Sequence, residues 1–188
     1  MEYIVKATNA ELGFNIIENP SQKNYYKHCH TGFEFLLFLE GDAEYVIEDR
    51  KFSLMPYDLI IIKPSQYHYL SIRSKKTYSR FVMNFQKECV PEILMEYLMN
   101  CPSVIKLDKE DELISLFSKP YRYLNEFKQN SLPLINSVIT QIICLSAQKK
   151  SEEKHLLKTS PLTSLVIKYV NENLNQSLNL DNIAKKLF

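Results

Sequence analysis

The chain has 188 residues, of which 45% are hydrophobic and 24% are charged. That composition suffices for one globular core with a helical appendage. Lysine and arginine total 23 against 22 acidic residues, so the formal net charge of +1 suggests neither nucleic acid nor an anionic membrane as a partner. Evidence for DNA binding must therefore come from a motif.

The cysteines and the N-terminus indicate where the protein resides. Its four cysteines are scattered and form no CxxC pair, which is typical of a reducing cytoplasm. The N-terminus has no apolar run of signal-peptide length, and no segment reaches the ~20 apolar residues of a membrane span. We expect a soluble cytoplasmic protein with no membrane partner.

The chain up to Phe85 has the pattern of a β-rich domain. Short runs of aromatic and β-branched residues alternate with turn formers such as Gly41-Asp42 and Pro64-Ser65-Gln66. Close, regular spacing of such runs favours a sandwich or barrel. The predicted strands are residues 14–18, 33–40, 43–48, 52–55, 59–63, 67–72 and 78–85.

After Phe85 the apolar residues recur at helical spacing, which makes the predicted fold class α+β. Helices are expected over 90–98, over 108–129 with a break or kink at Pro120, and over 132–149 just after Pro133. A polar stretch, 148–159, has the composition of a linker. The third helix carries a wide apolar seam made of Leu134, Ile135, Val138, Ile139, Ile142 and Leu145.

One polar cluster stands out in the β-rich part. His28 and His30 form an HxH pair, Glu34 follows after three residues, and Gly41 follows after six more. This spacing resembles the first motif of the cupin superfamily, and residues 56–68, ending in His68, resemble the second. Tyr57 stands where the family usually has glycine, Gln66 occupies a turn that normally contains glycine, and the interval from Pro64 to His68 is short. The short form resembles the sensor domains of AraC-type regulators.

Strand geometry indicates how these side chains could meet. Alternate residues of a strand share a face, so His28 and His30 would point the same way. Six extended residues would span ~20 Å, whereas metal ligands lie at ~2 Å from the ion, so Gly32 must permit a turn before Glu34 can join them. With that turn, His28, His30, Glu34 and His68 could bind a divalent metal.

The same groups could instead line an organic-effector pocket or merely sit at the barrel rim. We predict an effector site, because sparse polar groups in an apolar cavity are typical of small-molecule sites. No cofactor is expected, and a divalent metal is the alternative. Tyr25, Tyr26, Tyr67 and Tyr69 also lie nearby in sequence, although Tyr67 and Tyr69 should face away from His68. The predicted effector residues are His28, His30, Glu34, Tyr45 and His68.

The tail carries a second cluster. Ser160-Pro161 and Asn179 are predicted helix starts, and Leu178 could form a hydrophobic staple with Ile183. Spacing alone predicts two amphipathic helices. The segment 167–187 also resembles the opening of the AraC-type DNA-binding domain, with a YxxxN pattern at Tyr169–Asn173 and Ala184 as a small packing residue. The recognition helix would follow Phe188, so we expect a truncated chain that does not read DNA itself.

The order of these parts resembles an AraC/XylS-type transcription regulator. The resemblance implies a cupin-like effector-binding barrel with an N-terminal arm at 1–86, a helical dimerisation region at 87–150, a linker at 151–160 and the start of a helix-turn-helix domain at 161–188. It also implies a homodimer joined by the seam of the third helix, with DNA bound only through the full-length protein.

The predicted function is an effector-responsive regulator rather than an enzyme, with a sugar as one candidate effector. The alternative is a metal-dependent cupin oxygenase or isomerase that uses His28, His30, Glu34 and His68 around an open coordination position. A third reading is a dimerisation module whose pocket binds nothing.

Overall fold

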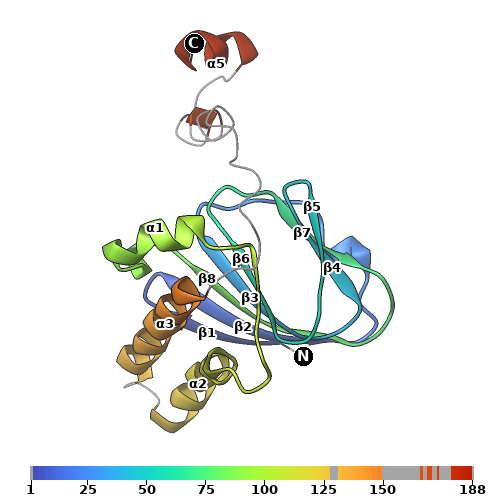
Figure 1. Cartoon of the computed structure of the whole chain (residues 1–188), viewed down its shortest axis with the longest axis vertical. Coiled ribbons are helices and arrows are strands. Elements are labelled where there is room, and N and C mark those ends of the chain that lie inside the picture. Colours follow the sequence, from blue (N-terminus) through green and yellow to red (C-terminus); the bar gives the residue numbers. More distant parts are fainter. Residues whose placement is uncertain are drawn as a thin grey trace. The chain divides into compact units, whose positions relative to one another are not determined.

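The structure, a computed structural model, describes residues 2–127, 131–149, 166, 169, 170, 173 and 179–187. The chain divides into two compact units, Met1–Ser151 and Glu152–Phe188. The first unit contains two antiparallel sheets and helices α1 (Glu92–Asn100), α2 (Glu112–Phe127) and α3 (Ser131–Gln148), so the predicted barrel and the predicted helical region belong to one unit (Figure 1).

The two sheets have six and three strands. In spatial order the large sheet consists of β1 (Glu2–Ala7), β2 (Ala10–Ile17), β8 (Tyr78–Phe85), β3 (Phe33–Glu40), β6 (Asp58–Ile62) and β9 (Val104–Lys106). The small sheet consists of β5 (Arg50–Ser53), β4 (Ala43–Ile47) and β7 (His68–Ile72). Two short 3-10 helices lie at Gln22–Asn24 (η1), between β2 and β3, and at Lys87–Cys89 (η2), after β8. This is the jelly-roll-like sandwich that the sequence predicts.

Alternation along the central strands divides the core into two layers. Leu36 and Phe38 of β3 belong to a buried cluster with Tyr45 of β4, whereas Phe35 and Leu37 belong to a second cluster with the helices. Successive side chains of a strand point to opposite faces, so a strand that is buried on both faces is apolar throughout. The run 33–38 shows this pattern except at Glu34, the one charged residue within it.

Helices α1 (Glu92–Asn100), α2 (Glu112–Phe127) and α3 (Ser131–Gln148) cover the face of the large sheet that points away from the small sheet (Figure 1). Phe117 of α2 and Ile139 of α3 are almost fully buried there. Helix α2 continues through Pro120, where the sequence predicts a break or kink.

The apolar seam of α3 faces mainly into its own domain. Ile135, Val138, Ile139 and Ile142 are at most 2% exposed, and only Leu134, at 38%, is clearly open to solvent. By length and composition alone, α3 would also pass as a membrane span, but burial of this face against the sheet accounts for its apolar character. The dimer role of the seam stays a prediction.

Two strands are absent from the sequence prediction. β1 pairs with β2 in the register Val5 opposite Leu12, and both side chains are 1% exposed, so the predicted arm is an edge strand of the sheet. β9 pairs with β6. It has only three residues, which are too few for an alternating pattern to be recognised in the sequence.

The second unit contains helix α5 (Leu180–Leu187). The side-chain oxygen of Asn179 accepts a hydrogen bond from the backbone N–H of Asn182 at 2.8 Å, which confirms the predicted N-cap. Nδ2 of Asn173 donates to the carbonyl of Tyr169 at 2.8 Å, so the YxxxN pair is in contact. The predicted linker, the Ser160-Pro161 start and Leu178 lie outside the described residues.

Candidate functional site

A cavity of about 240 Å³ opens at the mouth of the sandwich. Its walls come from the segment before β3 and from strands β3, β4, β7 and β8. The lining residues are Asn24, Tyr25, Tyr26, His28, Glu34, Tyr45, Leu70 and Arg80.

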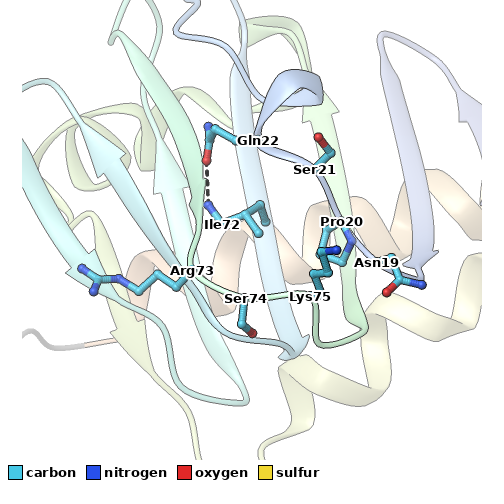
Figure 2. A pocket seen from close by; sticks show the side chains of 8 residues that line it. All are labelled: Asn19, Pro20, Ser21, Gln22, Ile72, Arg73, Ser74 and Lys75. Carbon is cyan, nitrogen blue, oxygen red and sulfur yellow. Dashed lines mark hydrogen bonds between the residues drawn. The ribbon is translucent and has the colours of Figure 1, made fainter.

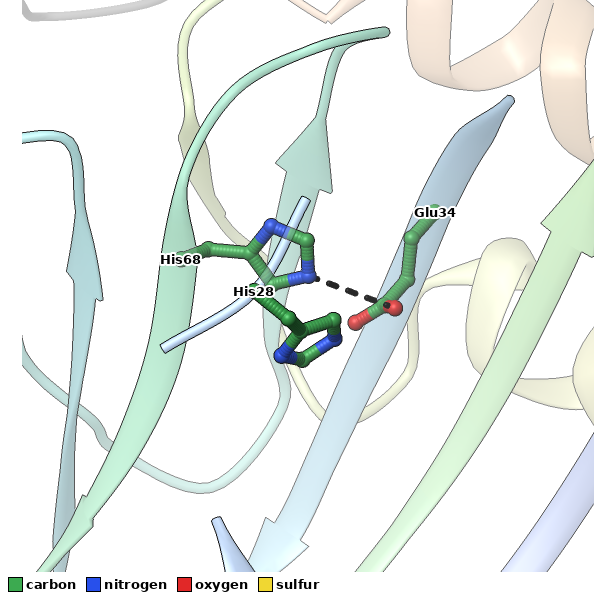
Figure 3. A group of neighbouring side chains, drawn as sticks. All are labelled: His28, Glu34 and His68. Atoms are coloured by element: carbon green, nitrogen blue, oxygen red, sulfur yellow. Dashed lines mark ion pairs between the residues drawn. The ribbon is translucent and has the colours of Figure 1, made fainter. Parts of the chain in front are cut away.

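Glu34 is the centre of the polar cluster. It lies near the start of β3 and is 7% exposed. The hydroxyl of Tyr45 donates to Oε1 at 2.8 Å, while Nε2 of His30 and Nε2 of His68 lie 3.4 and 3.7 Å from Oε2. The rings of His28 and His68 are 4.3 Å apart. All five predicted effector residues are thus brought together, and Figure 3 shows three of them.

Backbone contacts hold the three imidazoles in the same way. Nδ1 of His28, His30 and His68 lies 3.0, 3.0 and 2.9 Å from the carbonyls of Tyr26, Gly32 and Gln66 respectively. A carbonyl can only accept, so each contact favours a proton on Nδ1; Nε2 then carries the lone pair in the neutral ring and a second proton in the imidazolium. His28 and His68 also exchange two backbone hydrogen bonds, of 3.1 and 2.9 Å.

These residues fit a divalent metal. His28, Glu34 and His68 offer ligand atoms that all lie within 4.8 Å of one another, and the geometry does not include His30 in that set. Within the described part of the chain, Nε2 of His68 is buried without a hydrogen-bond partner. Two imidazoles whose second nitrogen is held by a carbonyl, together with one carboxylate, suit zinc, iron, manganese or nickel.

Backbone close to the site is unusually constrained. Gly32 lies in a bend, as predicted, and an added Cβ would come within 2.7 Å of the carbonyl oxygen of Phe85. Tyr57, where the cupin pattern has glycine, keeps a φ of 72°, and Ser65 has a φ of 66°. The N–H of Ser65 donates to the carbonyl of His30 at 2.8 Å, so this left-handed turn helps to place His30.

The electrostatics of the cluster favour an ionised Glu34. Burial alone would raise its pKa, but the contacts with His30 and His68 and the charge of Arg80 outweigh burial, and its pKa falls well below the usual range. The contact with Glu34 raises the pKa of His30 against partial burial. Burial and the neighbouring Glu34 raise the pKa of Tyr45, which therefore remains a proton donor.

The sequence prediction omits Asn24, Leu70 and Arg80 of the cavity lining, and of these Arg80 of β8 is the charged one. A signal was available, because Tyr78, Arg80 and Val82 alternate on one strand face, and both apolar members of that set are buried between the sheets. A charged residue on an otherwise apolar inward face is a candidate for function.

The tyrosines divide as strand alternation predicts. Tyr25 and Tyr26 line the cavity with Tyr45, whereas Tyr67 and Tyr69 do not. The ring of Tyr67 is 42% exposed and lies 5.3 Å from the ammonium of Lys27.

A second, more open depression lies beside residues 19–22 and 72–75 (Figure 2). Gln22 bridges its two sides. Its side chain accepts from the N–H of Ile72 at 2.8 Å and donates to the carbonyl of Leu70 at 2.9 Å. These bonds tie the segment before β3, which carries Tyr25 and His28, to strand β7.

Comparison with known proteins gives a family. The family model described as "AraC-like ligand binding domain" matches residues 12–138. No curated protein shows significant similarity to the chain.

Solved structures similar to the chain include cupins. A cupin superfamily protein from Desulfitobacterium hafniense is 13% identical, with a TM-score of 0.40, over 46% of this chain and 77% of that one. A cupin 2 conserved barrel domain protein from Salinispora arenicola is 12% identical, with a TM-score of 0.40, over 46% and 76%. AerE from Microcystis aeruginosa is 15% identical, with a TM-score of 0.45, over 58% and 49%.

The two-sheet fold with a polar cavity between its sheets defines a cupin-like ligand-binding domain. The family model covers the small sheet, the large sheet apart from β1 and the start of β2, and most of the helical layer, so the chain belongs to the AraC-like ligand binding domain family.

The coupling between Glu34 and His30 has a defined pH dependence. Glu34, with its lowered pKa, adds stability that is present above its ordinary pKa of 4.5 and is lost as the pH falls towards its pKa in the folded protein. His30, with its raised pKa, adds stability that is present below 6.5 and is lost as the pH rises through its folded pKa. Both contributions are therefore present between those two values.

We expect Glu34→Gln to lower the pKa of His30, because a neutral amide no longer stabilises the imidazolium. An NMR titration of the His30 ring proton measures this pKa. Glu44→Gln is the matched control. Glu44 lies on β4 and pairs with Arg73, so its substitution should leave the pKa of His30 unchanged. An unaltered His30 pKa in Glu34→Gln would show that the two groups are not coupled.

Proposed function

We propose that this domain binds a small polar effector in the cavity between its sheets and thereby controls a transcription regulator. One observation carries the proposal: an ionised, hydrogen-bonded carboxylate lies beside histidines and tyrosines in an otherwise apolar interior. The cavity lining combines three tyrosine rings and Leu70 with a few convergent polar groups, which is typical of a small-molecule site. Family membership supports the same conclusion.

The cavity limits what the effector can be. Its volume of about 240 Å³ lies below the ~300–1,000 Å³ typical of sites for drug-sized ligands, so the effector is a small metabolite. Its hydroxyl or N–H groups would donate to Glu34, and the ring of Tyr25 offers a flat surface beside it.

The C-terminal unit supports the regulatory part of the proposal. Its described residues include helix α5 with an asparagine cap and the contacting Tyr169–Asn173 pair, both of which belong to the segment that resembles an AraC-type DNA-binding domain. In such a regulator, the effector alters DNA binding only by its difference in affinity for two arrangements of the protein. The described cysteines are unpaired, in keeping with a cytoplasmic regulator.

Effector binding should be visible as thermal stabilisation. A ligand at 100 times its Kd adds about 2.7 kcal/mol, or roughly 5–10 °C in Tm for a domain of this size. We expect one class in a panel of sugars, hydroxy acids and amino acids to raise the Tm, and Glu34→Gln to abolish that shift relative to its own baseline.

Tyr97→Phe is the control for this experiment, since Tyr97 lies on α1 and is 62% exposed. An unshifted Tm throughout the panel, or an equal shift in Glu34→Gln, would contradict effector binding at this site.

We propose further that the domain forms a homodimer through the α2–α3 hairpin. Most of the predicted seam is buried in its own core, but Leu134 and its neighbour Leu132 remain 38% and 42% exposed, and Leu124 and Phe127 of α2 are 42% and 46% exposed. Exposed apolar side chains in one region are typical of an interface. The two-fold symmetry of a dimer would set the spacing of two DNA half-sites.

Leu134→Glu should weaken self-association at least ~10-fold, because it places a charge in the apolar contact. Sedimentation velocity measures the fraction of dimer. Ile93→Glu, at an 80% exposed position of α1, is the matched control and should not change it. A wild-type chain that remains monomeric at all concentrations would argue against the dimer.

A second candidate function is a metal-dependent enzyme, which the His28–Glu34–His68 geometry favours. A divalent metal bound there would act as a Lewis acid towards an oxygen of the substrate. The chain's own contribution would be to hold the ligand nitrogens, through the carbonyl contacts of His28 and His68.

Elemental analysis of untagged protein tests metal binding. If the site holds a metal, His28→Ala should reduce metal affinity at least ~10-fold, because one of three ligands is lost. His155→Ala, which alters the histidine outside both motifs, is the control. Absence of metal from wild-type protein purified without chelators, or equal metal content in His28→Ala, would remove the enzyme from consideration.

A further inference from the structure

We propose that Arg80 and Tyr25 form a subsite for the carboxylate of the effector, so that the ligand is a small carboxylic acid, such as a hydroxy acid, rather than a neutral sugar. This inference rests on the proposed effector-binding function and specifies its ligand. The subsite lies in the same cavity as Glu34, and both of its residues line that cavity.

Arg80 is held in place but has few hydrogen bonds. In the sheet it lies opposite Phe38 of β3, and its guanidinium carbon lies 5.9 and 5.5 Å from the ring centroids of Tyr25 and Tyr78. Nη1 donates to the hydroxyl of Tyr78 at 3.3 Å. Among the described residues, Nε of Arg80 is buried and has no hydrogen-bond partner.

A buried guanidinium of this kind requires an anion. The group carries five donors and a permanent charge, and a neutral phenol such as Tyr78 does not compensate that charge. Glu34 influences Arg80 electrostatically, but the described residues include no ion pair or hydrogen bond between the two side chains. A carboxylate is the planar partner that matches the guanidinium fork.

Tyr25 provides the second donor. Its hydroxyl is buried and, within the described ranges, has no hydrogen-bond partner. Burial raises the pKa of Tyr25 despite the opposing charge of Arg80, so the phenol keeps its proton. Its ring packs edge-on against Tyr78 at 6.1 Å, which fixes its orientation. Buried donors without partners are costly, and a ligand that brings acceptor oxygens relieves that cost.

The opposite wall of the cavity has the complementary character. Glu34 accepts hydrogen bonds, and His28 lies beside it. A ligand that presents a carboxylate to Arg80 and a hydroxyl to Glu34 satisfies both walls. A neutral sugar would leave the charge of Arg80 uncompensated. The combination specifies a small carboxylic acid whose second polar group donates to Glu34, as the hydroxyl of a hydroxy acid does.

Acetate isolates the carboxylate contact, with acetamide as its neutral isostere. The side-chain Nε–H resonance of Arg80 in the ¹³C,¹⁵N-labelled 188-residue chain, assigned through its bonds to the Arg80 backbone, reports the contact by NMR. We expect a saturable shift with acetate in the millimolar range, as befits a fragment of this size, and no saturable shift with acetamide.

Two substitutions test the roles of Arg80 and Tyr25. Because Arg80→Gln removes the reporting resonance, acetate affinity is measured in all variants from the resonances of the other residues that line the cavity. Arg80→Gln should weaken acetate binding at least ~10-fold, and Tyr25→Phe, which conserves the ring, ~3–10-fold. Arg122→Gln, the same change at an exposed position of α2, should leave affinity unchanged. If Arg80→Gln fails to fold, Tyr25→Phe and the comparison of acetate with acetamide still decide.

Failure of this inference is separable from failure of the proposed function. Equal responses to acetate and acetamide, a shift that does not saturate, or undiminished binding in Tyr25→Phe would overturn the carboxylate subsite. In each of those cases, effector binding would still be supported by a panel ligand that raises the Tm of the wild-type protein but not that of Glu34→Gln. Acetate binding at Arg80 without any such panel ligand would support the subsite and count against the sensor.

Discussion

The burial of one carboxylate between two sheets governs the organisation of this domain. A charged group in an apolar interior is tolerated only when it is paired and hydrogen-bonded. Glu34 meets that condition through partners from three segments that are distant in sequence: Tyr45 on β4, His68 on β7 and His30 before β3. Satisfying the carboxylate therefore holds the small sheet, the large sheet and the segment before β3 in register at the mouth of the cavity.

The same arrangement accounts for both candidate chemistries. Backbone carbonyls hold the Nδ1 side of each histidine and leave Nε2 directed towards the carboxylate, which suits a metal ion or the polar edge of a small molecule. Arg80 distinguishes the cavity from a site made for a metal alone, because it contributes a positive charge on another wall. A metal ion and a guanidinium would both attract a carboxylate ligand, so the two chemistries are compatible.

Sequence reasoning located most of the sandwich and the histidine–glutamate cluster because both leave local signals. Seven strand runs and the HxH spacing are readable over a few residues, and all five predicted site residues meet in space. The sequence prediction omits Arg80, because the strand 78–85 is recognised by its apolar residues and that pattern assigns no role to a charged one. The seam of α3 could be read as an interface or as a core face, and only the neighbouring sheet shows that Ile135 and Ile139 are core residues. β9 depends on pairing with β6, which no three-residue pattern reveals.

The large sheet separates the cavity and the small sheet on one face from the three helices on the other. On β8, Arg80 faces the cavity, and the next residue, Phe81, packs against Phe117 and Tyr121 of α2, with ring centroids 6.1 and 5.8 Å away. The backbone between these two residues cannot shift on one side without shifting on the other, since packed interiors deform little. Strand β8 therefore contacts the ligand with one face and helix α2 with the other. A shift of its backbone at the cavity would reach the helix directly, without a chain of intervening side-chain contacts.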